Sequence, residues 1–125
     1  MCIQTCDSSD QNLVTSVSLP GFGLAGKFPE CLTQLKYLQG LDLSGNMLTG
    51  GIPSSIGNLV NLKYLFLQNN RMSGPLPTAI GELVLLEILE LQSNLFFGSL
   101  PASFDHLIAL QYLNLQYNSL SGAGP

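Results

Sequence analysis

The stretch LKYLQGLDLSGNMLTGGIPSSIGN, residues 35–58, sets the pattern for the rest of the chain. Its spacing of leucines returns every 24 residues. The units that repeat this spacing are residues 35–58, 59–82, 83–106 and 107–125, the last of them truncated. Because so many positions stay in phase over four units, we conclude that the chain repeats one structural unit.

Within each unit the fixed positions follow the pattern L-x-x-L-x-L-x-x-N-x-L. In the first complete unit these positions are Leu38, Leu41, Leu43, Asn46 and Leu48. A 24-residue period with this pattern is typical of a leucine-rich repeat.

One period earlier, residues 11–34 form a degenerate first repeat in which Val17 stands in place of Leu41. Terminal repeats are expected to be atypical in this way. Residues 1–10 are polar and contain two cysteines, so we interpret them as a partial N-terminal cap. The sequence therefore predicts a single domain over residues 1–125.

Each L-x-L segment predicts a short strand, because side chains two residues apart point to the same face of a strand. A single repeat cannot cover its own leucines, so the repeats must stack and bury a shared core. Stacking places the strands side by side in a parallel sheet at a spacing of about 4.8 Å. The predicted fold class is an α/β-type leucine-rich-repeat solenoid. We expect a right-handed superhelix with this short-stranded sheet on its concave face and 3₁₀ or loop segments on its convex face.

The second half of each unit carries the pattern L-x-G-x-[IL]-P, first at residues 48–53. Glycine permits a turn that a Cβ atom would obstruct. The proline that ends the pattern confines ladder pairing to an edge or a turn. Beyond the proline, Ile56, Ile80 and Phe104 are expected to close the convex side through short 3₁₀ turns.

An asparagine follows each predicted strand from the first complete unit onward, where the chain turns. These residues are Asn46, Asn70, Asn94 and Asn118. An amide turned inwards there can bond backbone groups of the turn and of the neighbouring unit. We therefore predict a structural asparagine ladder rather than a polar binding strip.

The composition excludes several classes of partner. The chain is 46% hydrophobic and 10% charged, with a formal net charge of −4. Its basic residues are scattered, whereas a nucleic-acid surface gathers Lys and Arg, so we expect no nucleic-acid partner. The longest apolar runs are too short to span a membrane, so we expect no membrane contact by this segment. The opening MCIQTCDSSD lacks the basic and apolar regions of a signal peptide.

Three cysteines, Cys2, Cys6 and Cys31, lie in the first part of the chain. Because three is an odd number, at most one internal disulfide forms among them. Two interpretations are open: a disulfide-stabilised cap in an oxidising compartment, or three reduced thiols. Their spacing and the single histidine do not supply the roughly four ligands of a zinc site, so we predict no metal and no cofactor.

The residues that flank the buried leucines of each strand point towards the concave face. In the later repeats many of them are aromatic, aliphatic or acidic. The candidate ligand-binding residues are Tyr64, Phe66, Ile88, Glu90, Tyr112, Asn114 and Tyr117. Exposed aromatics beside an acid suit a protein or peptide ligand, because tyrosine supplies a large rigid contact area. The alternative is that they are ordinary strand-forming residues chosen for cross-strand packing.

Nothing in the sequence supports an enzyme. His106 lies in a surface slot between units, and its neighbour Asp105 need not converge with it. Asp42 and Glu90 are two repeats apart, roughly 10 Å, which slightly exceeds the separation in an inverting glycosidase. The glycines recur as repeat turns and not as a phosphate loop that opens a helix. We therefore predict a non-catalytic protein.

The L-x-G-x-[IL]-P pattern after the asparagine resembles the plant-specific class of leucine-rich repeats, over about residues 14–125. The resemblance implies a recognition module similar to part of a plant receptor-kinase or receptor-like ectodomain, or of a polygalacturonase-inhibiting protein. It also implies a protein or peptide ligand and a location outside the cell or at its surface. An intracellular location stays open.

The last unit favours an alternative function. Its leucines would face an open end beside an unpaired edge strand, which invites association. These residues are Leu107, Leu110, Leu113, Leu115 and Leu120. The chain would then be a structural or self-assembling scaffold that forms a homodimer through its C-terminal end.

Overall fold

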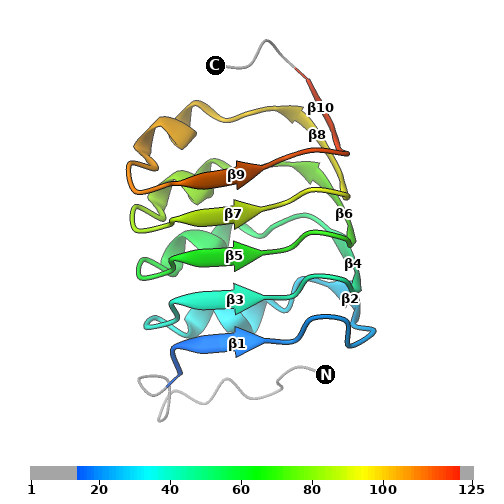
Figure 1. Cartoon of the computed structure of the whole chain (residues 1–125), viewed down its shortest axis with the longest axis horizontal. Helices are drawn as coiled ribbons and strands as arrows, with labels where there is room; N and C mark the ends of the chain where they lie inside the picture. The colour runs from blue at the N-terminus through cyan, green and yellow to red at the C-terminus, as the bar shows by residue number, and fades with distance from the viewer. Residues whose placement is uncertain (1–13, 122–125) are drawn as a thin grey trace.

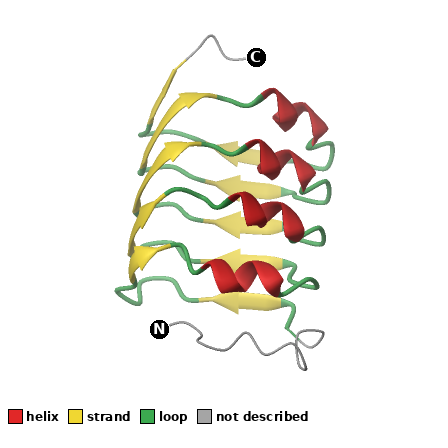
Figure 2. Ribbon diagram, turned by 180° about the vertical axis from the view of Figure 1, so that it is seen from behind, coloured by secondary structure: helices red, strands yellow, loops and turns green. Residues whose placement is uncertain are grey.

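The computed structural model describes residues 14–121, which form a regular stack of repeats (Figure 1). Each complete turn of the stack adds a strand to one sheet, a strand to a second sheet and a short 3₁₀ helix. Figure 2 shows the helices together on the side away from the first sheet. This architecture confirms the predicted leucine-rich-repeat solenoid. The predicted cap over residues 1–10 lies outside the described residues, as do Cys2 and Cys6, two of the three cysteines considered for a disulfide.

The first sheet is parallel, and its strands follow one another in chain order. They are β1 (Ser16–Ser18), β3 (Gly40–Asp42), β5 (Tyr64–Phe66), β7 (Ile88–Glu90) and β9 (Tyr112–Asn114). Each residue pairs with the residue 24 positions further on, so Leu65 lies between Leu41 and Leu89. The period of the sequence is therefore also the register of this sheet.

A second parallel sheet occupies segments for which the sequence predicts only turns. Its strands are β2 (Ala25–Lys27), β4 (Met47–Gly50), β6 (Arg71–Pro75), β8 (Leu95–Ser99) and β10 (Ser119–Ser121). Here Thr49 pairs with Arg71, an offset of 22 residues instead of 24. The turn prediction was incomplete: Gly50 has the positive φ (76°) that glycine accepts easily, yet it is also the last residue of strand β4.

Asparagine side chains occupy the corner between the two sheets, where the register changes. The Nδ2 of Asn70 donates to the carbonyls of Leu43 (3.0 Å) and Leu67 (3.1 Å). Its Oδ1 accepts from the N–H of Leu48 at 3.0 Å. Corresponding bonds are made by Asn46, Asn94 and Asn118. Each of these amides therefore joins its own repeat to the preceding one.

Short 3₁₀ helices cover the side of the stack opposite the first sheet. They are η2 (Glu30–Gln34), η3 (Ser54–Asn58), η4 (Thr78–Glu82) and η5 (Ala102–His106). A proline precedes each of them, and its carbonyl accepts the first helical hydrogen bond, as Pro53 does from Ile56 at 3.0 Å. Ile56 and Ile80 are fully buried, whereas Phe104 in η5 is half-buried. The predicted 3₁₀ turns are confirmed.

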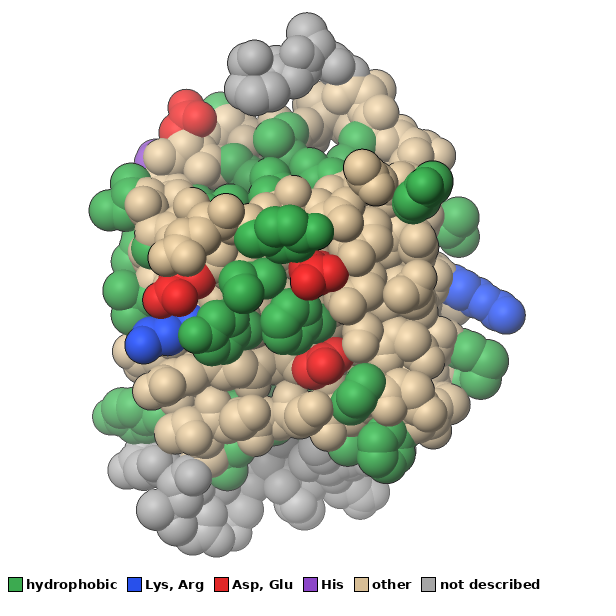
Figure 3. Space-filling model, viewed as in Figure 1, with side chains coloured by type: hydrophobic (Ala, Val, Ile, Leu, Met, Phe, Trp, Pro, Cys, Tyr) green, Lys and Arg blue, Asp and Glu red, His purple; other side chains and the backbone are tan. Residues whose placement is uncertain are grey.

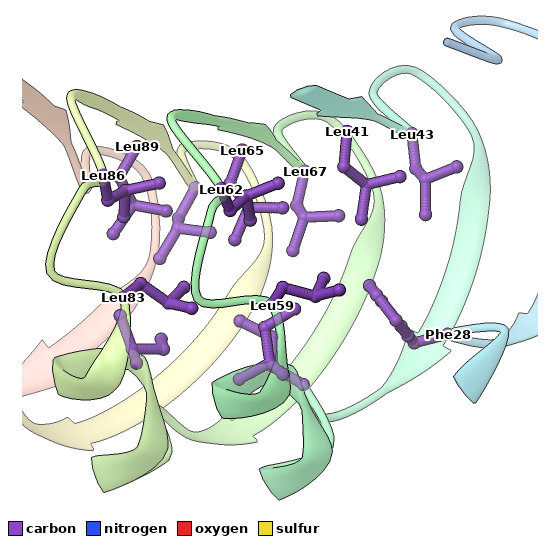
Figure 4. Packing of buried hydrophobic residues seen from close by; sticks show 14 of the residues in the cluster. Phe28, Leu41, Leu43, Leu59, Leu62, Leu65, Leu67, Leu83, Leu86 and Leu89 are labelled. Carbon is purple, nitrogen blue, oxygen red and sulfur yellow. The ribbon is translucent and has the colours of Figure 1, made fainter. Parts of the chain in front are cut away.

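The core is a column of apolar side chains between the sheets and the helices (Figure 4). In the first sheet, Leu65 and Leu89 have no exposed surface. The equivalent Leu113 in β9 is 37% exposed. Each repeat is covered by its two neighbours in the stack, and among the described residues the repeat that contains β9 has only one.

Candidate functional site

The outward side chains of the first sheet form one continuous surface, here called the strand face. One row across β5, β7 and β9 consists of Tyr64, Ile88 and Tyr112. The neighbouring row consists of Phe66, Glu90 and Asn114. The rows lie two residues apart along each strand, roughly 6.6 Å. The register therefore brings these six predicted residues into one group, here called the strand-face patch.

The strand-face patch is open to solvent. Tyr64 is 38% exposed and Tyr112 is 48% exposed, while Phe66 and Ile88 are half-buried. Figure 3 shows hydrophobic side chains gathered over the middle of this face, with acidic side chains beside them. Gly40 leaves room next to Tyr64, whose ring carbon lies 3.9 Å from the place a Cβ of Gly40 would take. The aromatic rings are thus available for contact.

The patch ends where the strand face becomes small and polar. The outward residues of β1 and β3 are Ser16, Ser18, Gly40 and Asp42. None of these side chains offers the apolar area that Phe66 or Tyr112 provides. The strand face therefore divides into a polar half on the first two strands and an aromatic half on the last three.

The two acids of the strand face have different hydrogen bonds. The Oδ1 of Asp42 accepts from both the N–H (2.9 Å) and the Oγ (2.6 Å) of Ser44, which ties this carboxylate into the turn after β3. Glu90 instead accepts a hydrogen bond on Oε1 from Nε2 of Gln92 at 2.8 Å. Asn114 repeats the turn bond of Asp42, since its Oδ1 accepts from Gln116 N–H at 3.0 Å. The structure thus ties Asp42 and Asn114 to the backbone of the following turn, whereas Glu90, among the described residues, bonds only the side chain of Gln92.

A row of glutamines follows the strands of the patch. Gln68 and Gln92 each have a buried Oε1 that accepts no hydrogen bond from any described residue. Most buried polar atoms in proteins have a partner, so each such oxygen is an acceptor with unused capacity. Sequence reasoning did not select these glutamines.

Tyr117 is the one predicted binding residue that lies outside the patch. It follows β9 at the corner between the two sheets and is 78% exposed. Its φ is 58°, in the left-handed region that a bulky side chain rarely adopts. The same position in earlier repeats is occupied by Gly45, Asn69 and Ser93, which also have positive φ.

Residues considered for catalysis do not converge. His106 is exposed at the end of η5, away from the strand face. Asp42 and Glu90 lie on either side of Phe66 in the same row, with β5 between their strands. Within residues 14–121, no group of three His, Cys, Asp or Glu side chains is placed to hold a metal ion. The same residues contain no helix long and apolar enough to cross a membrane.

Two further apolar surfaces are present that sequence reasoning did not select. On the second sheet, Leu95 is 57% exposed and Phe97 is 51% exposed. On the turns that lead into the first sheet, an exposed aliphatic residue recurs at one repeat position, as Val60, Val84 and Ile108. The recurrence at the 24-residue period is a signal that the sequence already contained.

Family comparison agrees with this architecture. The leucine-rich-repeat family matches residues 13–72 and 36–96, and a further leucine-rich-repeat match covers residues 109–125. These matches cover more than half of the chain, which belongs to the leucine-rich-repeat family. No curated protein sequence matches the chain.

Solved structures of plant proteins are similar to this chain. A chain in the complex of BIR3 with SERK2 from Arabidopsis thaliana is 43% identical, with a TM-score of 0.83. The ectodomain of the membrane receptor kinase GASSHO1/SCHENGEN3 from Arabidopsis thaliana, in complex with CASPARIAN STRIP INTEGRITY FACTOR 2, is 36% identical, with a TM-score of 0.79. The plant peptide hormone receptor RGFR1, in complex with RGF2, is 37% identical, with a TM-score of 0.85.

Each of these matches covers 86% of the present chain. In return, the chain spans 58%, 13% and 17% of the three proteins, so it corresponds to a part of each. The neighbours confirm that the repeats are of the plant type that the L-x-G-x-[IL]-P pattern predicts.

Proposed function

We propose that this chain is a non-catalytic recognition module that binds a protein or peptide through the strand face. The observation that carries the proposal is the strand-face patch, in which exposed aromatic rings adjoin one carboxylate on three neighbouring strands. Aromatic side chains dominate the energy of protein interfaces because each buries a large apolar area at a small loss of conformational freedom.

The similar structures support this class of partner. RGFR1 is a peptide hormone receptor in complex with RGF2, and the GASSHO1/SCHENGEN3 ectodomain is in complex with CASPARIAN STRIP INTEGRITY FACTOR 2. By analogy with the ectodomain of that membrane receptor, we place the present chain outside the cell or at its surface. Its proposed activity is binding, without chemistry on the ligand.

The size of the strand face limits the affinity of this chain alone. Five strands at a spacing of about 4.8 Å span roughly 20 Å. A standard interface covers about 800 Å² per partner, which is more than the aromatic half of this face offers. We therefore expect weak binding by the isolated chain.

Replacing Phe66 by alanine tests the proposed site. Peptides are first selected from a phage-displayed random library on the immobilised chain, and their dissociation constants are then measured by calorimetry. Phe66→Ala should weaken binding about fivefold or more, since truncating a central aromatic removes more than about 1 kcal/mol. Because Phe66 is only half-buried, the melting temperature should stay within about 5 °C.

A matched control is Phe97→Ala on the second sheet, where Phe97 is 51% exposed. This variant loses a similar aromatic area from another face and should bind the selected peptides as the unmodified chain does. Peptides that bind equally well without Phe66, or that lose affinity equally in both variants, would show that the strand face is not the site.

A second candidate function is self-association through the repeat that contains β9. The observation that favours it is Leu113, which is 37% exposed although its counterpart Leu89 is fully buried. Leu113 lies in β9, which has one paired neighbour among the described strands, and an exposed leucine on such a strand is a typical contact for another chain. Its test is the oligomeric state in solution.

A further inference from the structure

Glu90 holds the only charge in the strands that build the patch. The residues of β5, β7 and β9 are otherwise aromatic, aliphatic or amide-bearing. Phe66 and Asn114 are its direct neighbours across the sheet, at about 4.8 Å per strand. The carboxylate is therefore surrounded by groups that do not neutralise it.

The Glu90 carboxylate is held in position by its own strand end. Nε2 of Gln92 donates to Oε1 at 2.8 Å, and Glu90 is half-buried. Among the described residues, no basic side chain pairs with this carboxylate. A half-buried anion without a cation gains more from a charged ligand than a fully solvated one, because nearby apolar groups reduce screening by water.

Basic residues of the chain lie elsewhere. Lys27 and Arg71 are in β2 and β6 of the second sheet. Lys36 precedes β3, and Lys63 directly precedes Tyr64, at the end of β5 remote from Phe66. Glu87, whose N–H donates to the carbonyl of Lys63 at 2.8 Å, carries the opposite charge beside Lys63 and leaves Glu90 without a cation among the described residues. The aromatic half of the strand face is thus negative, and a complementary ligand is positive.

We infer that the ligand of the strand face is a peptide segment that places a lysine or arginine side chain on Glu90. The cation pairs with the carboxylate, and its flat guanidinium or aliphatic stem packs on the ring of Phe66. Apolar side chains of the peptide, next to its lysine or arginine, pack against Tyr64, Ile88 and Tyr112. The inference rests on the proposed function and adds the chemistry of the ligand to it.

The experiment uses arginine-containing peptides and their citrulline analogues, which keep the shape of arginine without its charge. Peptides are selected on the full chain from a phage-displayed random library. Those that no longer bind the Phe66→Ala variant are synthesised with arginine and with citrulline. The inference predicts that selected peptides are enriched in Arg or Lys next to an apolar residue. It also predicts that citrulline weakens binding about tenfold, the usual effect of removing one hydrogen-bonded charge.

The variant Glu90→Gln should bind the arginine and citrulline peptides equally, because the partner of the charge is gone. Glu82→Gln is the matched control: it removes the same charge from the exposed side of η4 and should keep the tenfold preference. The comparison of the two peptides on the unmodified chain does not depend on the folding of any variant.

The outcomes separate the two proposals. Peptides that require Phe66 but show no basic enrichment and no citrulline effect would overturn this inference and leave the strand face as the binding site. A citrulline effect that survives in Glu90→Gln would place the cation elsewhere and also overturn it. A failure to select any peptide that requires Phe66 would overturn the proposed function and this inference with it.

Discussion

Tyr117 has a left-handed backbone conformation that glycine and asparagine adopt more readily. Its φ of 58° is close to the values of Gly45 (67°), Asn69 (61°) and Ser93 (59°) at the same place in other repeats. A left-handed conformation costs a residue with a Cβ atom roughly 1–2 kcal/mol. The tyrosine is 78% exposed, so little packing offsets this strain. Backbone strain that packing does not offset often marks a functional residue, so the strain at Tyr117 is a reason to test whether its side chain contacts the ligand.

We expect Tyr117→Gly to stabilise the chain by up to about 1 kcal/mol, because glycine adopts a positive φ without strain. The free energy of unfolding from urea denaturation measures the effect. Tyr112→Gly is the control, since Tyr112 is also exposed but lies in β9, where glycine weakens a strand. Destabilisation by both substitutions would show that Tyr117 is not strained.

Asn70→Ala should lower the free energy of unfolding by about 1–3 kcal/mol, because it leaves buried backbone groups without partners. The groups affected are the N–H of Leu48 and the carbonyls of Leu43 and Leu67. Asn61→Ala is the control, since the bond from its Nδ2 to the carbonyl of Lys36 is exposed. Chemical denaturation of both variants checks this difference, and equal losses would contradict a structural role for Asn70.

At the scale of elements, successive 3₁₀ helices approach one another where one of them has a glycine. A Cβ added to Gly81 in η4 would lie 2.5 Å from the carbonyl oxygen of Ser103 in η5 and 2.6 Å from its Cβ. Gly57 in η3 meets η4 in the same manner, with the carbonyl of Ala79 at 3.2 Å. The spacing of the helices therefore depends on the absence of side chains at these positions.

Gly81→Ala should destabilise the chain by about 1–3 kcal/mol, since the helices must separate to admit a methyl group. Gly40→Ala is a matched substitution, because its Cβ would meet Ser16 Oγ at 3.6 Å and the Tyr64 ring at 3.9 Å. These are ordinary contacts, so its effect should stay within about 0.5 kcal/mol. Thermal denaturation distinguishes the two. A neutral Gly81→Ala would mean that η5 moves without loss of packing.

At the scale of the whole molecule, equivalent apolar residues are most exposed in the repeat that contains β9. Ile108 is 86% exposed, whereas Val60 and Val84 at the same repeat position are 50% and 45% exposed. Leu113 follows the same trend. Stability in a repeat protein is a sum over neighbouring repeats, so the repeat that has one neighbour among residues 14–121 is the least covered of those that the structure describes.

If the chain associates through this end, light scattering across a dilution series should show a dimer that dissociates on dilution. Ile108→Lys should shift the chain towards the monomer, because it adds a charge to the repeat that exposes Leu113. Val60→Lys, at the equivalent position far from this end, should leave the association unchanged. A monomer at all concentrations would exclude self-association as the function.

Much of the fold was predictable because it depends on short-range chemistry that recurs in every repeat. The alternation of Leu41 and Leu43 with outward residues determines a strand, and stacking determines that the strands are parallel. The proline before each 3₁₀ helix determines where the helix begins. The apolar residue within it, such as Ile56 in η3, determines which side is buried. The rows of the strand face follow from the 24-residue period alone.

Only the tertiary structure decided how each repeat lies against the next. The offset of 22 residues in the second sheet depends on a displacement between repeats that no single repeat encodes. A shift of two residues keeps every side chain on its original face, so the sequence pattern looks the same for either register. The sequence by itself determined the repeating unit because local patterns specify it, and the contacts between repeats determined the rest.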